Sequence, residues 1–185
     1  MPNAVRTTAF CLLLLTSLSI PLTVSAVMVG LSTADLTSGS DAVVTGRVGK
    51  VKSHWSHDGK VIVTQAQVAV ERQVRGNVET DWITVEYTGG EVDGIGLRVS
   101  DMAPLQEGEN VLLFLKSGPS KRFAPESFDA AATPVYNMVG KAQGKYAIGA
   151  DGMARKSGFA IAGPEQGVDR DIPLDDLISK IRKGE

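Results

Sequence analysis

Between residues 42 and 88, hydrophobic side chains recur at every second position, and this period restricts the fold more than any other feature of the chain. It places alternate side chains on opposite faces of an extended strand. The stretches that show it are separated by Asp58-Gly59 and by Arg75-Gly76, dipeptides typical of turns. We therefore predict three long strands in an antiparallel meander with one buried face. The alternating positions are Val44, Gly46 and Val48; Ile62, Thr64, Ala66, Val68 and Val70; and Ile83, Val85 and Tyr87.

The alternation changes phase at Gly49, after which Val51, Ser53 and Trp55 take the opposite parity. A slip of one residue would turn every side chain to the wrong face of the sheet. A glycine at the phase change therefore predicts a β-bulge or the kind of bend found in barrels. Farther along, the unbroken apolar run 111–115 predicts a strand buried on both faces, at the centre of the core.

Helical patterns flank this β-rich region. At the start, Ser32 can cap a short helix, with Asp35 three residues on. Near the end, four apolar residues follow helical spacing, with acidic residues in the first turn and basic residues in the last. These four are Leu174, Leu177, Ile178 and Ile181. The expected fold class is mainly β: an antiparallel OB-like β-barrel over 42–170, a short helical lead-in over 27–41 and a C-terminal amphipathic helix over 171–185, packed on the barrel.

Residues 1–26 have the composition of a secretory signal peptide: Arg6, then an uncharged leucine-rich run, then small residues up to Ala26. Cleavage near Ala26 would give a secreted or periplasmic protein with no membrane span. The alternative is an uncleaved anchor, because the uncharged stretch continues to Leu31, although Pro21 weakens it. The single cysteine, Cys11, lies in the apolar run, so the exported chain would fold without disulfides.

The charge balance argues against one class of partner. The formal net charge is -2, whereas nucleic-acid-binding proteins carry a basic excess that neutralises phosphates. We expect no nucleic-acid partner.

The segment 89–96 contains four glycines between two strand-like stretches. We name Glu91, Asp93, Gly94 and Gly96 as candidate binding residues, because flanking glycines let backbone and side chains approach a ligand closely. The alternative is a tight barrel turn. Phosphate-loop and dinucleotide motifs do not fit, since no helix follows, and we expect no cofactor. The long connection 116–134 is a further candidate contact surface.

Gln143 and Lys145 lie in a stretch that joins two late strands, and they are candidates for lining a groove at the barrel rim. A turn around Gly144 that fixes the strand register would explain the same stretch without a binding role.

Metal and catalytic chemistry have few candidates. His54, His57 and Asp58 are weak metal candidates: only a turn could bring them together, since positions i and i+3 of a strand face opposite ways. We prefer the alternative, a solvated hairpin tip, where polar residues need no function. No serine lies in a nucleophile-elbow pattern. A small metal-dependent hydrolase that uses the two histidines and Asp58, or else Glu91 and Asp93, is an alternative function. Another is oligosaccharide binding on the barrel face, which would need Trp55, Trp82 and Tyr87 to be exposed.

The segments "SDAVVTGRV", "GGEVDGIGLRV", "EGENVLLFL" and "VGKAQGKY" resemble, in this order, a group of uncharacterised secreted bacterial proteins, over about residues 31 to 149. More distantly, the layout resembles the netrin-like OB-fold module of the tissue inhibitors of metalloproteinases. That resemblance implies a protease-inhibiting or protein-binding role. Those inhibitors place an N-terminal cysteine on the catalytic zinc, and a chain beginning near Val27 has none, so no functional residue is carried over.

These features together predict an exported, non-enzymatic binding module. Its expected partner is a protein, with a secreted protease as one candidate, contacted through barrel loops.

Overall fold

The computed structural model describes residues 28–118, 133–161 and 168–184. The predicted signal segment, 1–26, and most of the predicted connection 116–134 lie outside them. The elements are α2 (Thr33–Gly39), β1 (Ala42–Trp55), β2 (Ile62–Arg75), β3 (Trp82–Thr88), β4 (Gly90–Val92), β5 (Ile95–Leu97), β6 (Asn110–Ser117), β7 (Val135–Met138), the 3-10 helix η1 (Lys141–Gly144), β8 (Lys145–Ile148), β9 (Met153–Arg155), β10 (Asp171–Pro173) and α3 (Leu174–Lys183).

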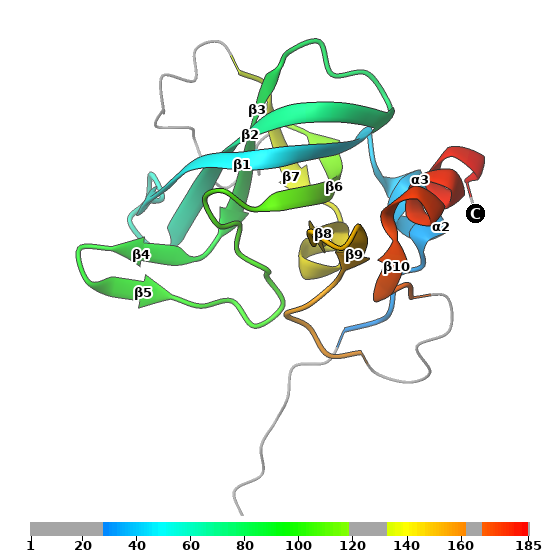
Figure 1. Cartoon of the computed structure of the whole chain (residues 1–185). Coiled ribbons are helices and arrows are strands. Elements are labelled where there is room, and N and C mark those ends of the chain that lie inside the picture. The colour runs from blue at the N-terminus through cyan, green and yellow to red at the C-terminus, as the bar shows by residue number, and fades with distance from the viewer. Residues whose placement is uncertain (1–27, 119–132, 162–167, 185) are drawn as a thin grey trace, which may run out of the picture.

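Five strands close into a barrel, in the order β1-β2-β3-β7-β6, and the ring is completed by pairing of β6 with β1 (Figure 1). This confirms the predicted OB-like β-barrel. One pairing differs from the antiparallel expectation, because β7 runs parallel to β3. These two strands are far apart in the chain, and parallel neighbours need a long crossover rather than a tight turn.

The phase change at Gly49 is a β-bulge, as predicted: the β1–β2 register shifts between Val48 and Val51. A Cβ at Gly49 would lie 2.9 Å from the Trp82 ring, so the lack of a side chain lets this indole lie against the strand. The first half of β1 also pairs with β6, whereas the half beyond the bulge pairs with β2 alone. The bulge thus marks the point where β1 leaves the closed part of the barrel.

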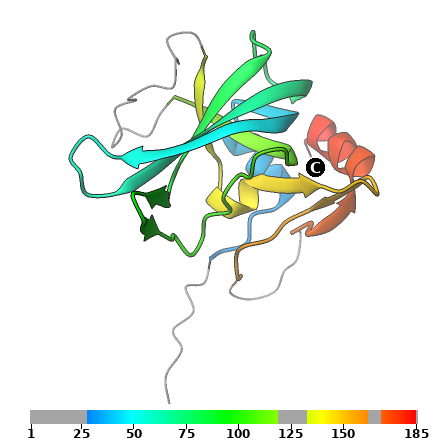
Figure 2. The same cartoon turned by 60° about the vertical axis from the view of Figure 1, so that its left-hand side comes forward.

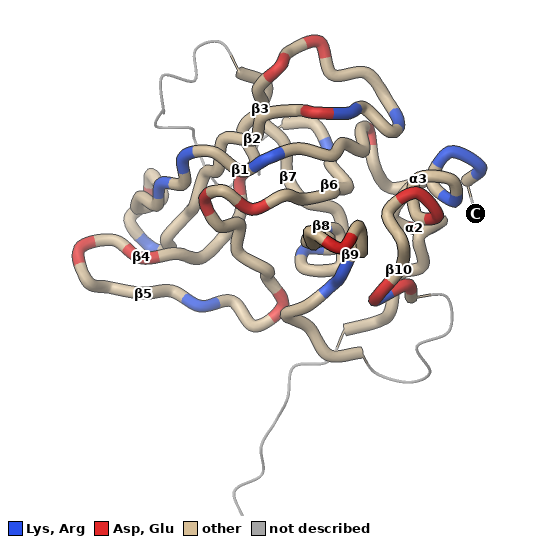
Figure 3. Tube along the Cα trace, in the orientation of Figure 1, with Lys and Arg blue, Asp and Glu red and all other residues tan. Residues whose placement is uncertain are grey.

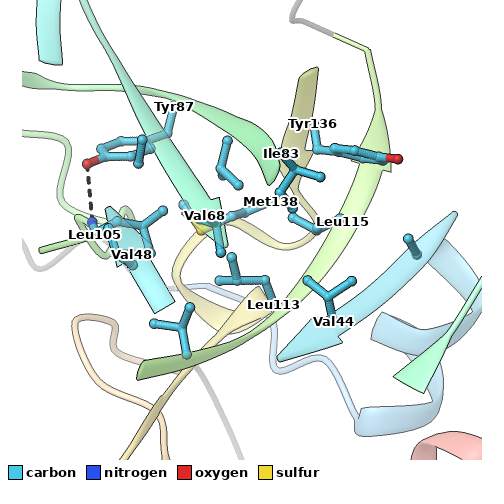
Figure 4. Close-up of a cluster of buried hydrophobic side chains, with 14 of the residues drawn as sticks. Val44, Val48, Val68, Ile83, Tyr87, Leu105, Leu113, Leu115, Tyr136 and Met138 are labelled. Carbon is cyan, nitrogen blue, oxygen red and sulfur yellow. Dashed lines mark hydrogen bonds between the residues drawn. The ribbon is translucent and has the colours of Figure 1, made fainter. Parts of the chain in front are cut away.

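Strand β6 is buried on both sides, and this confirms the prediction for residues 111–115. Its side chains alternate between two clusters. The barrel core contains Val44, Val48, Val68, Ile83, Val85, Tyr87, Leu105, Val111, Leu113, Leu115, Tyr136 and Met138, among others (Figure 4). The helix-side core contains Leu36, Val43, Val74, Leu112, Phe114, Tyr146, Ala154, Ile172, Leu177, Ile178 and Ile181.

The two helices cover one side of the barrel and contact each other (Figures 1 and 2). Helix α2 begins with the predicted capping box, in which the Ser32 hydroxyl accepts from the Asp35 N–H and the Asp35 carboxylate accepts from the Ser32 N–H. Helix α3 buries Leu177, Ile178 and Ile181, which confirms its predicted docking face. None of the described helices has the length and hydropathy needed to cross a membrane.

Candidate functional site

A recess lies between one end of the barrel and a projecting hairpin. Strands β4 and β5 form this hairpin, here called the arm, and Figure 1 shows it extending away from the barrel. The recess, here called the arm groove, has a volume of about 760 Å³. It is lined by Val51, Ser53, Thr64, Tyr87, Thr88, Gly89, Gly90, Glu91, Gly96, Leu97, Arg98, Val99, Ser100, Met102, Pro104, Leu105 and Gly158.

Two hydroxyl groups fix the base of the arm on the barrel. The Thr64 hydroxyl donates to the Gly89 carbonyl, and the Ser53 and Thr64 hydroxyls lie 2.8 Å apart. A Cβ on Gly90 would lie only 2.2 Å from Ser53 Oγ and 2.3 Å from Thr64 Oγ1, and the φ of Gly90 is +126°. Only glycine fits there without displacing the hydroxyls or straining the backbone. The arm is therefore positioned by contacts between its backbone and the sheet.

The floor of the groove is continuous with the barrel core. Tyr87, 7% exposed, belongs to both, and its hydroxyl accepts a hydrogen bond of 3.1 Å from the Leu105 N–H (Figure 4). Burial raises the pKa of Tyr87, so its phenol stays protonated at neutral pH. Val51 and Met102 pack against the same core from the groove side. A ligand in the groove would meet a mainly apolar floor with a few hydroxyl groups.

The segment between β5 and β6 forms the far wall of the groove and is held in place by a hydrogen bond and two ion pairs. The Lys145 ammonium group donates to the Pro104 carbonyl at 2.7 Å and pairs with Glu109 at 2.8 Å. Lys141 forms an ion pair with Asp101. These contacts connect the wall to η1 and β8, so the groove keeps its shape without a ligand.

The structure brings four of the six candidate binding residues together on the arm. Glu91 and Gly96 line the groove, and Asp93 and Gly94 form the turn of the arm, with φ values of 51° and 78°. The segment 89–96, for which the sequence allowed a ligand-binding loop or a tight barrel turn, thus forms most of a short hairpin.

The other two candidates, Gln143 and Lys145, are buried. The Gln143 amide oxygen accepts from the Leu31 N–H at 2.7 Å, and its nitrogen donates to the Val29 carbonyl at 2.9 Å. This side chain holds the N-terminal segment against η1, and Lys145 braces the groove wall from behind. The stretch around Gly144 is a 3-10 helix.

The weak metal candidates lie at the β1–β2 hairpin tip, where His57 and Asp58 are exposed. Asp58 accepts from the Ser56 hydroxyl at 2.7 Å and from the Lys60 N–H at 3.3 Å, and these hydrogen bonds lower its pKa. Its carboxylate thus stabilises the turn. Among the described residues, no three or more His, Cys, Asp or Glu side chains gather closely enough to hold a metal ion.

The three aromatic residues considered for oligosaccharide binding do not form one surface. Tyr87 is buried, whereas Trp55 and Trp82 are 39% and 45% exposed. In the β1–β2–β3 register, Trp55 pairs with Ile62 and Trp82 pairs with Ala69, so the two indoles lie at opposite ends of the sheet.

Sequence reasoning missed Ser53, Thr64 and Tyr87 as parts of the groove. The sequence pattern that could have indicated them is a hydroxyl-bearing residue at an inward position on each of β1 and β2, followed by paired glycines after β3. Inward polar residues need a partner, and here the partner is the backbone of the arm.

No protein-family model matches the chain, and no curated protein matches it either.

Proposed function

We propose that this chain is a non-enzymatic binding module that holds an extended segment of a protein partner in the arm groove. The observation that carries the proposal is the groove itself, whose volume of about 760 Å³ lies within the range of about 300–1,000 Å³ usual for ligand sites. Its apolar floor, scattered hydroxyl groups and braced wall suit a ligand bound by shape and a few hydrogen bonds.

The groove chemistry favours a peptide over a compact small molecule. Met102 and Val99 line the groove with partly exposed apolar side chains. Glu91 and Arg98 are exposed along the same recess and have opposite charges. Peptide segments present this mixture of apolar side chains, backbone polar groups and charges. Binding by loops on a rigid barrel is common. The netrin-like resemblance adds a secreted protease to the candidate partners.

The hydroxyl groups at the groove support a binding role. Ser53 and Thr64 hydrogen-bond to each other, and Thr64 also holds the Gly89 carbonyl. A serine or threonine nucleophile instead needs a general base within hydrogen-bond reach. The function of these hydroxyls is to position the arm.

The test is selection of binders from a random peptide library on the immobilised protein. Val99→Arg places a long charged side chain in the groove, and we expect it to weaken the binding of the selected peptides at least tenfold. Val29→Arg is the matched control, because Val29 is 80% exposed and lies outside the groove lining. Failure to select any peptide, or equal binding by Val99→Arg and wild type, would contradict the proposal.

We further propose that the protein is exported and loses residues 1–26, which places it in the periplasm or outside the cell. N-terminal sequencing of the protein recovered from these fractions should begin at or near Val27. Recovery of only full-length chain in the membrane fraction would instead favour an uncleaved anchor.

A further inference from the structure

The outer edge of β5 has the properties of an open strand-binding edge. Within the described ranges, β4 is the only strand that pairs with β5. Exposed edges are normally protected by a short strand length, by lysine or proline, by a bulge or by a covering segment. Strand β5 is short, with three residues, and has no other such protection within the described ranges. The sequence of β5, Ile-Gly-Leu, contains neither lysine nor proline.

The hairpin register determines which backbone groups face that edge. The positive φ values of Asp93 and Gly94 are those of a two-residue type I′ turn. In such a hairpin the pair next to the turn, Val92 with Ile95, is hydrogen-bonded, and the following pair, Glu91 with Gly96, is not. The N–H and C=O groups of Gly96 therefore point away from β4, toward the open edge.

The surroundings of the two arm glycines near this edge are open. A Cβ added at Gly96 or at Gly94 would meet no atom within 4 Å. The side chain of Ile95 is 56% exposed, which is unusual for a residue of its size and hydropathy. The face of the arm at Gly96 is thus open, and a strand added beside β5 could cover this isoleucine.

The arm is also electrically polarised along its length. Acidic positions lie on β4 and in the turn, and a basic position follows β5 (Figure 3). Glu91, Asp93 and Arg98 are exposed, and none of them forms an ion pair in the part of the chain that the structure describes. Their charges are available to a ligand.

We propose that the arm binds an extended peptide as an added antiparallel strand on β5, with the central peptide residue exchanging both backbone hydrogen bonds with Gly96. This inference rests on the proposed function and specifies its ligand. In the antiparallel direction, the N-terminal side of the peptide lies beside Arg98 and its C-terminal side beside Asp93. The preferred peptide therefore has an acidic residue about two positions before its centre and a basic residue about three positions after it.

The first test compares Gly96→Pro with Gly96→Ala, using the peptides selected on the wild-type protein. Proline removes the outward N–H without removing a β4–β5 hydrogen bond, whereas alanine keeps the N–H and has open space for its methyl group. We expect Gly96→Pro to weaken binding at least tenfold and Gly96→Ala to change it less than twofold. Equal binding by the two variants would overturn the proposal.

The second test leaves the protein unchanged. A single N-methyl group on the peptide backbone should weaken binding at least tenfold at the central residue, whose N–H bonds to Gly96. It should have little effect at the residue on either side, whose N–H points away from β5. A uniform response along the peptide would contradict strand addition.

The two proposals fail separately. If Val99→Arg abolishes binding while Gly96→Pro and the N-methyl series have no effect, the groove binds peptides but β5 does not add a strand. If Val99→Arg has no effect, the proposed function itself is wrong.

Discussion

The surroundings of Lys156 disfavour its positive charge. It is 6% exposed, and its ammonium nitrogen has no hydrogen-bond acceptor among the described residues and lies 4.5 Å from the centre of the Tyr146 ring. Burial, aided by repulsion from Arg170, lowers its pKa to about 8, and the Asp169 carboxylate offsets only part of this. The aromatic ring gives the cation a favourable contact.

This environment predicts a stability that rises with pH. Below pH 8 the amine is protonated in both states, so the folded protein carries the full cost of a buried charge. Between pH 8 and 10.5 the folded state releases the proton while the unfolded state keeps it, so the free energy of unfolding increases, by at most about 3 kcal/mol. Lys156→Met should be more stable than wild type at pH 7, and this difference should shrink as the pH rises to 10.5. Urea denaturation of both proteins across this pH range measures the difference between their free energies of unfolding. The tyrosines titrate in both proteins, so their contribution cancels in this difference. A difference that does not depend on pH would show that the buried amine is not the cause.

At the scale of the elements, short sequence patterns predicted the strands and turns that depend on interactions between neighbouring residues. The alternation, the Gly49 phase change and the Asp58-Gly59 turn were enough for β1 and β2, because each acts over a few residues. The parallel pairing of β7 with β3 could not be predicted this way, since it depends on barrel closure between segments far apart in the chain. The arm had a recognisable Asp93-Gly94 turn signal, but its three-residue strands are too short to show alternation. Its attachment to Ser53 and Thr64 is a tertiary contact, and such a contact leaves no periodic pattern in the sequence from which it could be predicted.

At the scale of the whole molecule, β6 connects two cores that would otherwise be separate. Its odd-numbered residues from Val111 to Leu115 enter the barrel core, and its even-numbered residues enter the helix-side core with α3. Both cores must therefore form around the same strand, and their stabilities are linked. A fold with this arrangement should unfold as one unit even though the helices lie outside the barrel.

Leu177→Ala tests this linkage. Leu177 is fully buried in the helix-side core, and its truncation should lower the free energy of unfolding by about 2–5 kcal/mol. If the cores are coupled, native-state hydrogen exchange should show the same loss of protection at the amides of α3 and of β6, because both open only in global unfolding. Leu174→Ala is the control on the same helix, since Leu174 is only half-buried and its truncation should cost less. Faster exchange in α3 with unchanged protection in β6 would mean that the helix opens on its own. The barrel would then be stable without it, and the link through β6 would be wrong.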